Sequence, residues 1–348
     1  MPHWRGPGAV RVPFFVAAML NSFATFLQDS QRVLLTTHEN PDADGIGALV
    51  GLAHFLRHSG KEVRIVVSPA LPFFLAFLDP EGWIETYEPG GRHADLPHWP
   101  DTWVLVDASE IQRLGMMQGA FEASKAVKAC LDHHMKDAPK GFDHEFTDSA
   151  ASASAELVYD LAAPRMALPR PMADALYAGL VDDTGNFRFS NSTPKAHRIA
   201  AELIAQGVDP AGIYQALYHQ GRPERLRLFG RAFGTLRLQA EGRYATLALT
   251  RGDLAACGAH HDDMDGLVNE PLRLRGVEVA GLLYELEDGR IKASLRSRGQ
   301  VDVNAICRTF GGGGHRLASG AKLEGPLASA LSSLDAVVIQ HLEPDPSH

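Results

Sequence analysis

The chain has 348 residues, enough for two domains that each bury a core of their own. Hydrophobic residues make up 45% of it and charged residues 22%, the proportions of an ordinary globular protein. The net charge of −9 argues against a protein that coats long nucleic acid, because such binding requires the neutralisation of many phosphates. A small nucleotide or short oligonucleotide held by a few local cations stays compatible with it. Three cysteines without a CxxC pair favour a reducing compartment and no structural zinc site.

An apolar stretch near the N-terminus, 12–27, has the composition of a possible signal peptide. Asn21 and Ser22 interrupt it, and it is too short to span a membrane. The spacing of Leu20 and Phe23 predicts instead an amphipathic helix that leads into the first strand. We therefore expect a cytoplasmic protein that makes no membrane contact.

Short apolar runs alternate with helix-like segments through the first part of the chain, 20–208. This alternation is typical of a parallel β-sheet covered by helices on both faces, so the predicted fold class is α/β. The expected strands are 33–35, 63–67, 103–106 and 127–131, and the expected helices are 45–58, 150–162, 171–181 and 194–206.

The pattern changes after residue 208. A helical, arginine-rich stretch, 209–238, is interpreted as a connector, and 239–348 as a smaller α+β domain. In the second domain, Asp288-Gly289 is a favourable turn between two alternating apolar runs and predicts a β-hairpin. The expected elements are strand 244–250, helical stretch 262–275, hairpin strands 277–286 and 290–297, helix 301–310 and helix 326–342.

His38, Asp42 and Asp44 lie together in a turn that follows the first apolar run. Parallel sheets bind ligands at the carboxyl ends of their strands, and an imidazole with two carboxylates suits Mn²⁺, Mg²⁺ or Zn²⁺. The alternative is a solvated turn in which the two aspartates cap the next helix. This stretch taken alone does not decide between a metal site and a helix cap.

Three further polar groups end apolar segments of the same domain: Asp107, the triplet 132–134 and the pair 182–183. We expect all of them at one edge of the sheet, next to the first turn. Two divalent ions about 3.5–4 Å apart need a bridging carboxylate and ligands from several segments. The groups of the right kind are His38, Asp42, Asp44, Asp107, His133 and Asp183.

These segments resemble the four motifs of the DHH phosphoesterase superfamily: HENPDAD at 38–44, Asp107, the Asp-His-His triplet and VDDTGNFRF at 181–189. The segment RTFGGGGH at 308–315 is similar to the glycine–histidine signature of the associated DHHA1 domain. Together with 294–297 and 301–304, it resembles the NanoRNase/pAp-phosphatase branch. The resemblance covers roughly residues 20 to 345 in order, and five ordered motifs make chance agreement improbable.

The resemblance implies a parallel-sheet DHH domain followed by a smaller α+β DHHA1 domain, with the active cleft between them. It implies two Mn²⁺ ions per site, with Mg²⁺, Co²⁺ or Zn²⁺ as alternatives. The implied ligands are His38 and Asp42 for one ion, Asp44, His133 and Asp183 for the other, and Asp107 as the bridge.

Other roles follow from the same resemblance. His134 is expected to act on the reacting phosphate, so His134 and Asp107 are the predicted catalytic residues. Asp182 is expected to support the metal ligands without binding a metal itself, and Asp132 is expected to orient the ring of His133. Family members often carry an asparagine just after the triplet, whereas this chain has 135–138 as Met-Lys-Asp-Ala.

The second domain carries the predicted substrate-binding residues. Successive glycines let backbone N–H groups approach a phosphate, and an arginine can grip it through two hydrogen bonds. A flexible turn before strand 321–323 is the alternative for the glycines, and no Gly-Lys-Ser/Thr follows them, so they are not a nucleotide P-loop. The predicted contacts are Arg296, Ser297, Asn304, Gly312, Gly313, Gly314 and His315.

The predicted function is metal-dependent hydrolysis of short oligoribonucleotides, including linear dinucleotides, to mononucleotides, and of 3′-phosphoadenosine 5′-phosphate (pAp) to AMP. Two metal ions would activate a bridging water. We expect no long nucleic acid and no membrane as partners, and the resemblance suggests a homodimer. The alternatives are a cyclic-dinucleotide phosphodiesterase, a RecJ-like single-strand exonuclease and a non-catalytic nucleotide-binding protein.

Overall fold

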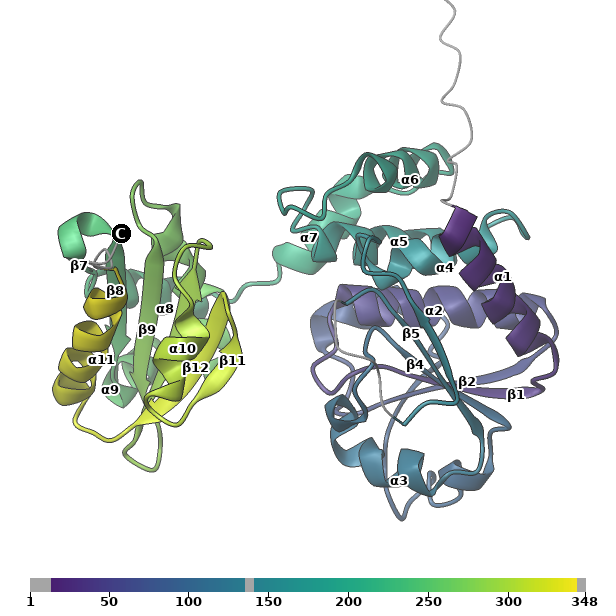
Figure 1. Ribbon diagram of the computed structural model, residues 1–348, viewed down its shortest axis with the longest axis horizontal. Coiled ribbons are helices and arrows are strands. Elements are labelled where there is room, and N and C mark those ends of the chain that lie inside the picture. Colours follow the sequence, from purple (N-terminus) through teal and green to yellow (C-terminus); the bar gives the residue numbers. More distant parts are fainter. Residues whose placement is uncertain (1–13, 135–140, 343–348) are drawn as a thin grey trace, which may run out of the picture. The chain divides into compact units, whose positions relative to one another are not determined.

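A computed structural model describes residues 14–134 and 141–342 (Figure 1). The chain forms two compact units that meet in sequence between Gln220 and Gly221. None of the helices in the described ranges has both the length and the apolar character needed to cross a membrane. The three cysteines, Cys130, Cys257 and Cys307, are free and buried.

The first unit contains a six-stranded sheet in which all neighbouring strands are parallel. The strand order in the sheet is β3-β2-β1-β4-β5-β6. The chain adds strands outward from β1 to β3 on one side and then from β4 to β6 on the other, so the order of addition switches between β1 and β4. Such a switch point leaves a crevice at the carboxyl ends of the two strands, where open α/β sheets bind ligands. The strands are β1 (Arg32–Thr36), β2 (Glu62–Val67), β3 (Ile84–Thr86), β4 (Thr102–Val106), β5 (Val127–Asp132) and β6 (His144–Thr147).

Helices cover both faces of this sheet, as the α/β prediction requires. Figure 1 shows α2, α4 and α5 on one face and α3 on the other. The N-terminal helix α1 buries Leu20 and Phe23 in the core of the first face, which confirms the predicted amphipathic helix. The helices are α1 (Phe14–Gln28), α2 (Ala43–His58), α3 (Gln118–Ala123), α4 (Ser154–Ala162), α5 (Arg170–Asp183), α6 (Pro194–Ala205) and α7 (Pro210–Tyr218).

Glycines let α2 and α5 approach unusually closely. A Cβ atom on Gly47 would lie 2.3 Å from the carbonyl oxygen of Ala175, and one on Gly179 would lie 2.9 Å from Asp44 Oδ1. No side chain fits at such distances without moving the neighbouring helix. The antiparallel contact brings the last residue of α5, Asp183, beside the first turn of α2.

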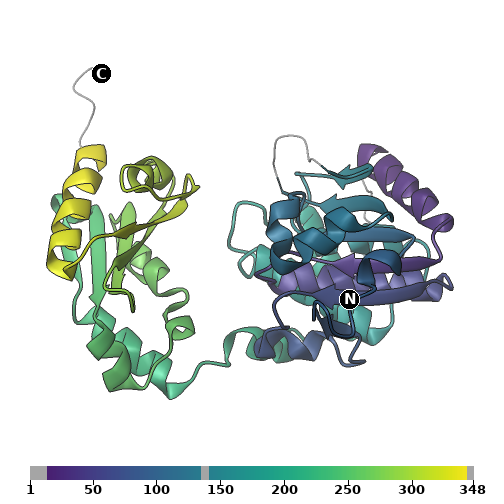
Figure 2. The same ribbon diagram turned by 90° about the horizontal axis from the view of Figure 1, so that it is seen from below.

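The second unit is built on a mixed six-stranded sheet in the order β11-β12-β10-β9-β8-β7. Its strands β8 and β9 are parallel, while the other neighbours are antiparallel. Figure 2 shows α11 along one face of this sheet. The strands are β7 (Arg237–Gln239), β8 (Tyr244–Leu249), β9 (Val279–Glu285), β10 (Ile291–Ser297), β11 (Gly313–His315) and β12 (Ala318–Leu323), and the helices are α8 (Pro223–Phe233), α9 (Arg251–Cys257), α10 (Val303–Arg308) and α11 (Leu327–Leu342).

The hairpin predicted at Asp288-Gly289 is confirmed, because β9 and β10 pair across it. One expectation for this unit differs from the structure. The helical stretch expected at 262–275 consists of two 3₁₀ segments, His261–Met264 and Leu267–Arg273, and Pro271 breaks the α-helical hydrogen bonding of the second. Part of the glycine run, for which a flexible turn was the alternative, forms edge strand β11.

The stretch 209–238, expected as a connector, is divided between the units. Helix α7 packs against α5, whereas α8 packs against α9 and β8.

Candidate active site

The position of Asp42 is compatible with both roles that the sequence left open. It is the N-cap residue of α2, and its Oδ1 accepts hydrogen bonds from the backbone N–H groups of Asp44 and Gly45 at 3.1 and 3.0 Å. Its other oxygen, Oδ2, lies 4.0 Å from His38 Nε2. Capping therefore fixes the carboxylate and leaves one oxygen directed at the predicted site.

Asp107 lies at the centre of the arrangement. It directly follows β4 and has a left-handed backbone, with φ of 61°, a conformation that aspartate tolerates better than most residues. Its Oδ2 lies 3.4 Å from His38 Nε2, and its Oδ1 lies 3.6 Å from His133 Nε2. The two oxygens of one buried carboxylate thus face two imidazoles that come from different strand ends.

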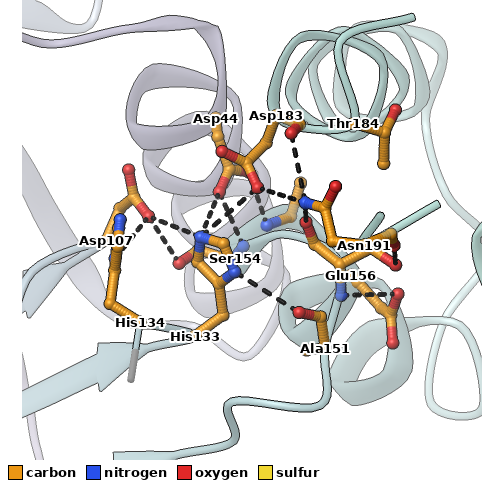
Figure 3. A network of polar contacts seen from close by, with 12 residues as sticks. Asp44, Asp107, His133, His134, Ala151, Ser154, Glu156, Asp183, Thr184 and Asn191 are labelled. Atoms are coloured by element: carbon orange, nitrogen blue, oxygen red, sulfur yellow. Dashed lines mark hydrogen bonds and ion pairs between the residues drawn. The ribbon is translucent and has the colours of Figure 1, made fainter. Parts of the chain in front are cut away.

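A second group forms around His133. Its Nε2 lies 3.7 Å from Asp44 Oδ2 and 3.6 Å from Asp183 Oδ2. Figure 3 shows the carboxylates of Asp44, Asp107 and Asp183 converging on this ring. The ligand atoms form three sets within 4.8 Å of one another: His38–Asp42–Asp107, Asp44–His133–Asp183 and Asp107–His133–His134.

The arrangement fits a divalent cation. His133 Nδ1 lies 3.4 Å from the carbonyl oxygen of Ala151, so a proton on Nδ1 leaves Nε2 with a lone pair. That Nε2 is buried, has no hydrogen-bond partner among the described residues and faces carboxylate oxygens. A lone pair and anionic oxygens repel one another unless a cation lies between them.

The carboxylate pKa values reflect the same crowding. Burial raises the pKa of Asp44 well above its usual value, and the charges of Asp107 and Asp183 raise it further. Burial also raises the pKa of Asp42 and brings that of Asp183 to about 6. Burial by itself would raise the pKa of Asp107, but the imidazole of His38 and its neighbours outweigh it, so this pKa is lowered. A dication would relieve the repulsion among the four groups.

His134 is oriented by Asp132, which corrects the sequence expectation. Asp132 Oδ1 lies 2.7 Å from His134 Nδ1 and accepts the His134 backbone N–H at 3.2 Å, so it binds His134 and not His133. The physical reason is that a carboxylate at a strand end folds back onto the residue two positions later, as in an Asx turn. This hydrogen bond raises the pKa of His134, whose ring is partly exposed. The residues 135–138, where the family asparagine was missing, lie outside the described residues.

Two neighbouring residues have structural roles. Asp182 accepts the Ala43 backbone N–H at 3.2 Å and the Tyr218 hydroxyl at 2.8 Å, so it lies behind the site, as expected. Gly45 permits close packing beside the site, because a Cβ there would lie 2.7 Å from Thr37 Oγ1 and 3.4 Å from Asp107 Oδ2.

The sequence did not reveal the groups that hold the carboxylates. The backbone N–H groups of Ser154 and Ala155 donate to the two oxygens of Asp44 at 2.6 and 2.8 Å. Asn191 Nδ2 donates to Asp183 Oδ2 at 3.1 Å. The one signal in the sequence is the run of small residues at the start of the predicted helix 150–162, which indicates a helix cap alone.

In the second unit, strand register relates the predicted phosphate-binding residues. His315 on β11 pairs with Ala318 on β12, which pairs with Arg296 on β10, so the two basic side chains emerge on one face of the sheet. Arg296 is half-buried, and burial lowers the pKa of its guanidinium. Asn304 lies beside this region, with its Oδ1 3.5 Å from Ser319 Oγ.

The glycines of this region are needed for close backbone contacts. A Cβ on Gly312 would lie 2.2 Å from the Gly320 carbonyl oxygen, and one on Gly314, at φ of 146°, would lie 2.7 Å from that of Ala318. Ser297, also predicted to bind substrate, is buried, and its Oγ accepts a hydrogen bond from the backbone N–H of Gly299 at 3.1 Å. Gly313 is exposed between the two constrained glycines.

Comparison with known proteins now identifies the family. Residues 32–180 match the N-terminal domain of the DHH family, and 245–343 match the DHHA1 domain. The chain is 33% identical over 299 residues to the bifunctional oligoribonuclease and PAP phosphatase NrnA of Thermus thermophilus, covering 84% of each chain. The chain belongs to the DHH family of phosphoesterases. The first unit is thus the DHH domain and the second the DHHA1 domain.

Two further relatives agree with this assignment. The Bacillus subtilis bifunctional oligoribonuclease and PAP phosphatase NrnA is 29% identical over 299 residues, which cover 84% of this chain and 89% of that protein. A crystal structure of an exopolyphosphatase-related protein from Bacteroides fragilis matches with a TM-score of 0.86 and 27% identity, covering 93% of this chain and 96% of the other. As a DHH phosphoesterase, the protein is an enzyme that hydrolyses phosphoester bonds.

Proposed function

We propose that the protein binds two divalent ions in the DHH domain and uses them to hydrolyse short oligoribonucleotides to mononucleotides and pAp to AMP. The observation that carries this proposal is the position of Asp107, whose two carboxylate oxygens face two separate imidazoles at 3.4 and 3.6 Å. One ion would be held by His38 and Asp42, the other by the set around His133, and Asp107 would bridge them. A site of carboxylates with two imidazoles suits Mn²⁺ best, with Mg²⁺, Co²⁺ and Zn²⁺ as alternatives.

When bound, two such ions generate a nucleophile from water near pH 7 and neutralise charge on the phosphate. The residues of the chain then have separate tasks. Asp44 and Asp183 are fixed by hydrogen bonds from Ser154 and Asn191, so their geometry is set before substrate arrives. Preorganised groups of this kind lower the cost of reaching the transition state.

His134 is the proposed general acid. Asp132 holds its Nδ1 and raises its pKa, which favours the protonated ring, and the ring is 37% exposed at the edge of the site. A protonated His134 would give its Nε2 proton to the leaving oxygen of the substrate. Asp132 would keep the ring oriented during that transfer.

The proposed substrates are short because the predicted phosphate contacts are few. Arg296 and His315 lie on one face of the DHHA1 sheet and would hold one terminal phosphate, helped by the exposed backbone at Gly313. The acidic net charge of −9 disfavours long nucleic acid. The names of the two NrnA relatives support both substrate types. The cleft between the domains, the homodimer and the cytoplasmic location stay predictions.

The proposal is tested by incubating the protein with Mn²⁺ and labelled RNA of two to twenty nucleotides, pAp and a cyclic dinucleotide. We expect rapid hydrolysis of pAp and of RNA of up to about five nucleotides, and loss of both activities in Asp107→Ala. Equal processing of short and twenty-nucleotide RNA would favour the RecJ-like alternative. Preferential hydrolysis of the cyclic substrate would favour the cyclic-dinucleotide phosphodiesterase. Binding without hydrolysis, independent of metal, would indicate the non-catalytic alternative.

A further inference from the structure

A short segment that contains no predicted metal ligand touches three of the ligands. This segment, 151–155, follows β6 and forms the start of α4. Its Ala151 carbonyl oxygen lies 3.4 Å from His133 Nδ1, and its Ser154 hydroxyl donates to Asp107 Oδ1 at 2.9 Å. The backbone N–H groups of Ser154 and Ala155 hold both oxygens of Asp44. Figure 3 shows Asp44, Asp107, Ala151 and Ser154 gathered around the ring of His133.

Asn191 connects the same segment to the remaining ligand of this group. Its Nδ2 donates to Asp183 Oδ2 at 3.1 Å, to the Asp183 carbonyl oxygen at 3.1 Å and to the Ser152 carbonyl oxygen at 2.9 Å. The Ser152 hydroxyl donates in return to the Asn191 carbonyl oxygen at 2.6 Å. Reversing the amide would place Oδ1 against three oxygens, so the acceptors fix its orientation.

A group of buried charged side chains contacts this segment on the side away from the metal ligands. The Ser152 backbone N–H donates to Glu156 Oε2 at 3.2 Å, and Glu156 Oε1 lies 2.8 Å from Lys195 Nζ. Lys195 also pairs with Asp160. The side chains of Glu156 and Asp160 are each only 2% exposed, so the ion pairs are held in a fixed geometry and not screened by solvent.

We infer that Ser154 and Asn191 are positioning residues that fix Asp107 and Asp183 for the ion held by Asp44, His133 and Asp183. The inference rests on the proposed two-ion function. Hydrogen bonds to metal-ligating carboxylates restrict their rotation, and losing such a partner typically weakens metal binding about 10–100-fold. The ion held by His38 and Asp42 shares only Asp107 with this network, so the effect should be larger on the ion held by Asp44, His133 and Asp183.

The test is Mn²⁺ binding by isothermal titration calorimetry, together with thermal unfolding of the metal-free protein. The variants are Ser154→Ala, which removes the hydroxyl but keeps the backbone N–H, and Asn191→Ala. Ser192→Ala is the matched control, because its hydroxyl contacts only the exposed ring of His197 in the described structure, at 3.3 Å. We expect each test variant to weaken the binding of the ion held by Asp44, His133 and Asp183 about 10–100-fold, to weaken the binding of the other ion less, and we expect the control to bind both ions as the wild type does.

Activity supplies a second measurement. The rate of each test variant at limiting Mn²⁺ should fall and then recover at high Mn²⁺, which a purely structural defect would not allow. A lowered unfolding temperature with both Mn²⁺ affinities unchanged would overturn the inference and leave the proposed function intact. Failure of the wild-type protein to bind two ions would overturn the proposed function itself. If Asn191→Ala does not fold, Ser154→Ala still decides the question.

Discussion

Replacing Asp183 by asparagine should have opposite effects on the metal-free and the Mn²⁺-loaded protein. In the metal-free protein, burial raises the pKa of Asp183 from 3.8 to about 6, and the imidazole of His133 offsets only part of this cost. A shift of about two pKa units corresponds to roughly 3 kcal/mol of unfolding free energy. Since the pKa is higher in the folded state, the cost is absent below about pH 4 and grows until about pH 7. Asparagine has the same shape and does not carry this cost.

The loaded protein should behave in the reverse way. A ligand present at about 100 times its dissociation constant stabilises the folded state by roughly 2.7 kcal/mol per site. Asp183→Asn removes a proposed anionic ligand of one ion and should therefore lose most of the stabilisation that this ion provides. The folded state of the wild-type protein should be stabilised by both ions.

The assay is thermal unfolding at about pH 5 and pH 7.5, with and without Mn²⁺, where the two pH values bracket the cited pKa. Without metal at the higher pH, we expect Asp183→Asn to unfold up to about 6–12 °C above wild type, and the difference to shrink at the lower pH. Addition of Mn²⁺ should raise the unfolding temperature of the wild type more than that of Asp183→Asn. Asp174→Asn, on the same helix and paired with Arg170, is the control and should shift neither value. The prediction is refuted if Asp183→Asn is less stable than wild type without metal and is stabilised by Mn²⁺ as much as wild type.

Three further substitutions and one control test other features of the protein. Gly47→Ala should lower the unfolding free energy of the DHH domain by about 1–3 kcal/mol or more in urea titrations, because its Cβ would meet a backbone carbonyl of α5 at 2.3 Å. Gly119→Ala, whose Cβ would meet nothing within 4 Å, should not destabilise it. Tyr218→Phe removes the hydrogen bond to Asp182 and should raise the Mn²⁺ concentration needed for half-maximal activity several-fold, with little change in kcat at saturation. Arg296→Ala should raise the KM for pAp about tenfold or more and change kcat less, because it removes the proposed bidentate contact with the substrate phosphate.

The elements that carry the predicted ligands could be predicted from the sequence. Apolar runs of about five residues end at Asp107 and Asp132, and parallel strands bring such ends to one edge of a sheet. In the structure these strand ends do meet, with His38 Nε2 3.4 Å and His133 Nε2 3.6 Å from the carboxylate oxygens of Asp107. The edge strands β3 and β6 were missed, because three or four residues with half-exposed side chains give no apolar pattern.

The groups that hold the ligands could not be predicted. Ser154 and Asn191 are small polar residues whose partners lie 47 and 8 positions away in sequence, and no local pattern indicates such a pairing. The partner of Asp132 was predicted wrongly for a related reason. Two adjacent histidines follow it, and only the turn geometry decides which ring the carboxylate meets.

We propose that one carboxylate, that of Asp107, joins two metal ions. The most direct measurement is an anomalous difference map at the manganese absorption edge, from crystals grown with Mn²⁺. We expect two peaks about 3.5–4 Å apart on either side of Asp107, and no such pair in Asp107→Ala. A single peak, or two peaks that both persist in Asp107→Ala, would contradict it. The predicted neighbours are His38 and Asp42 for one peak, and Asp44, His133 and Asp183 for the other.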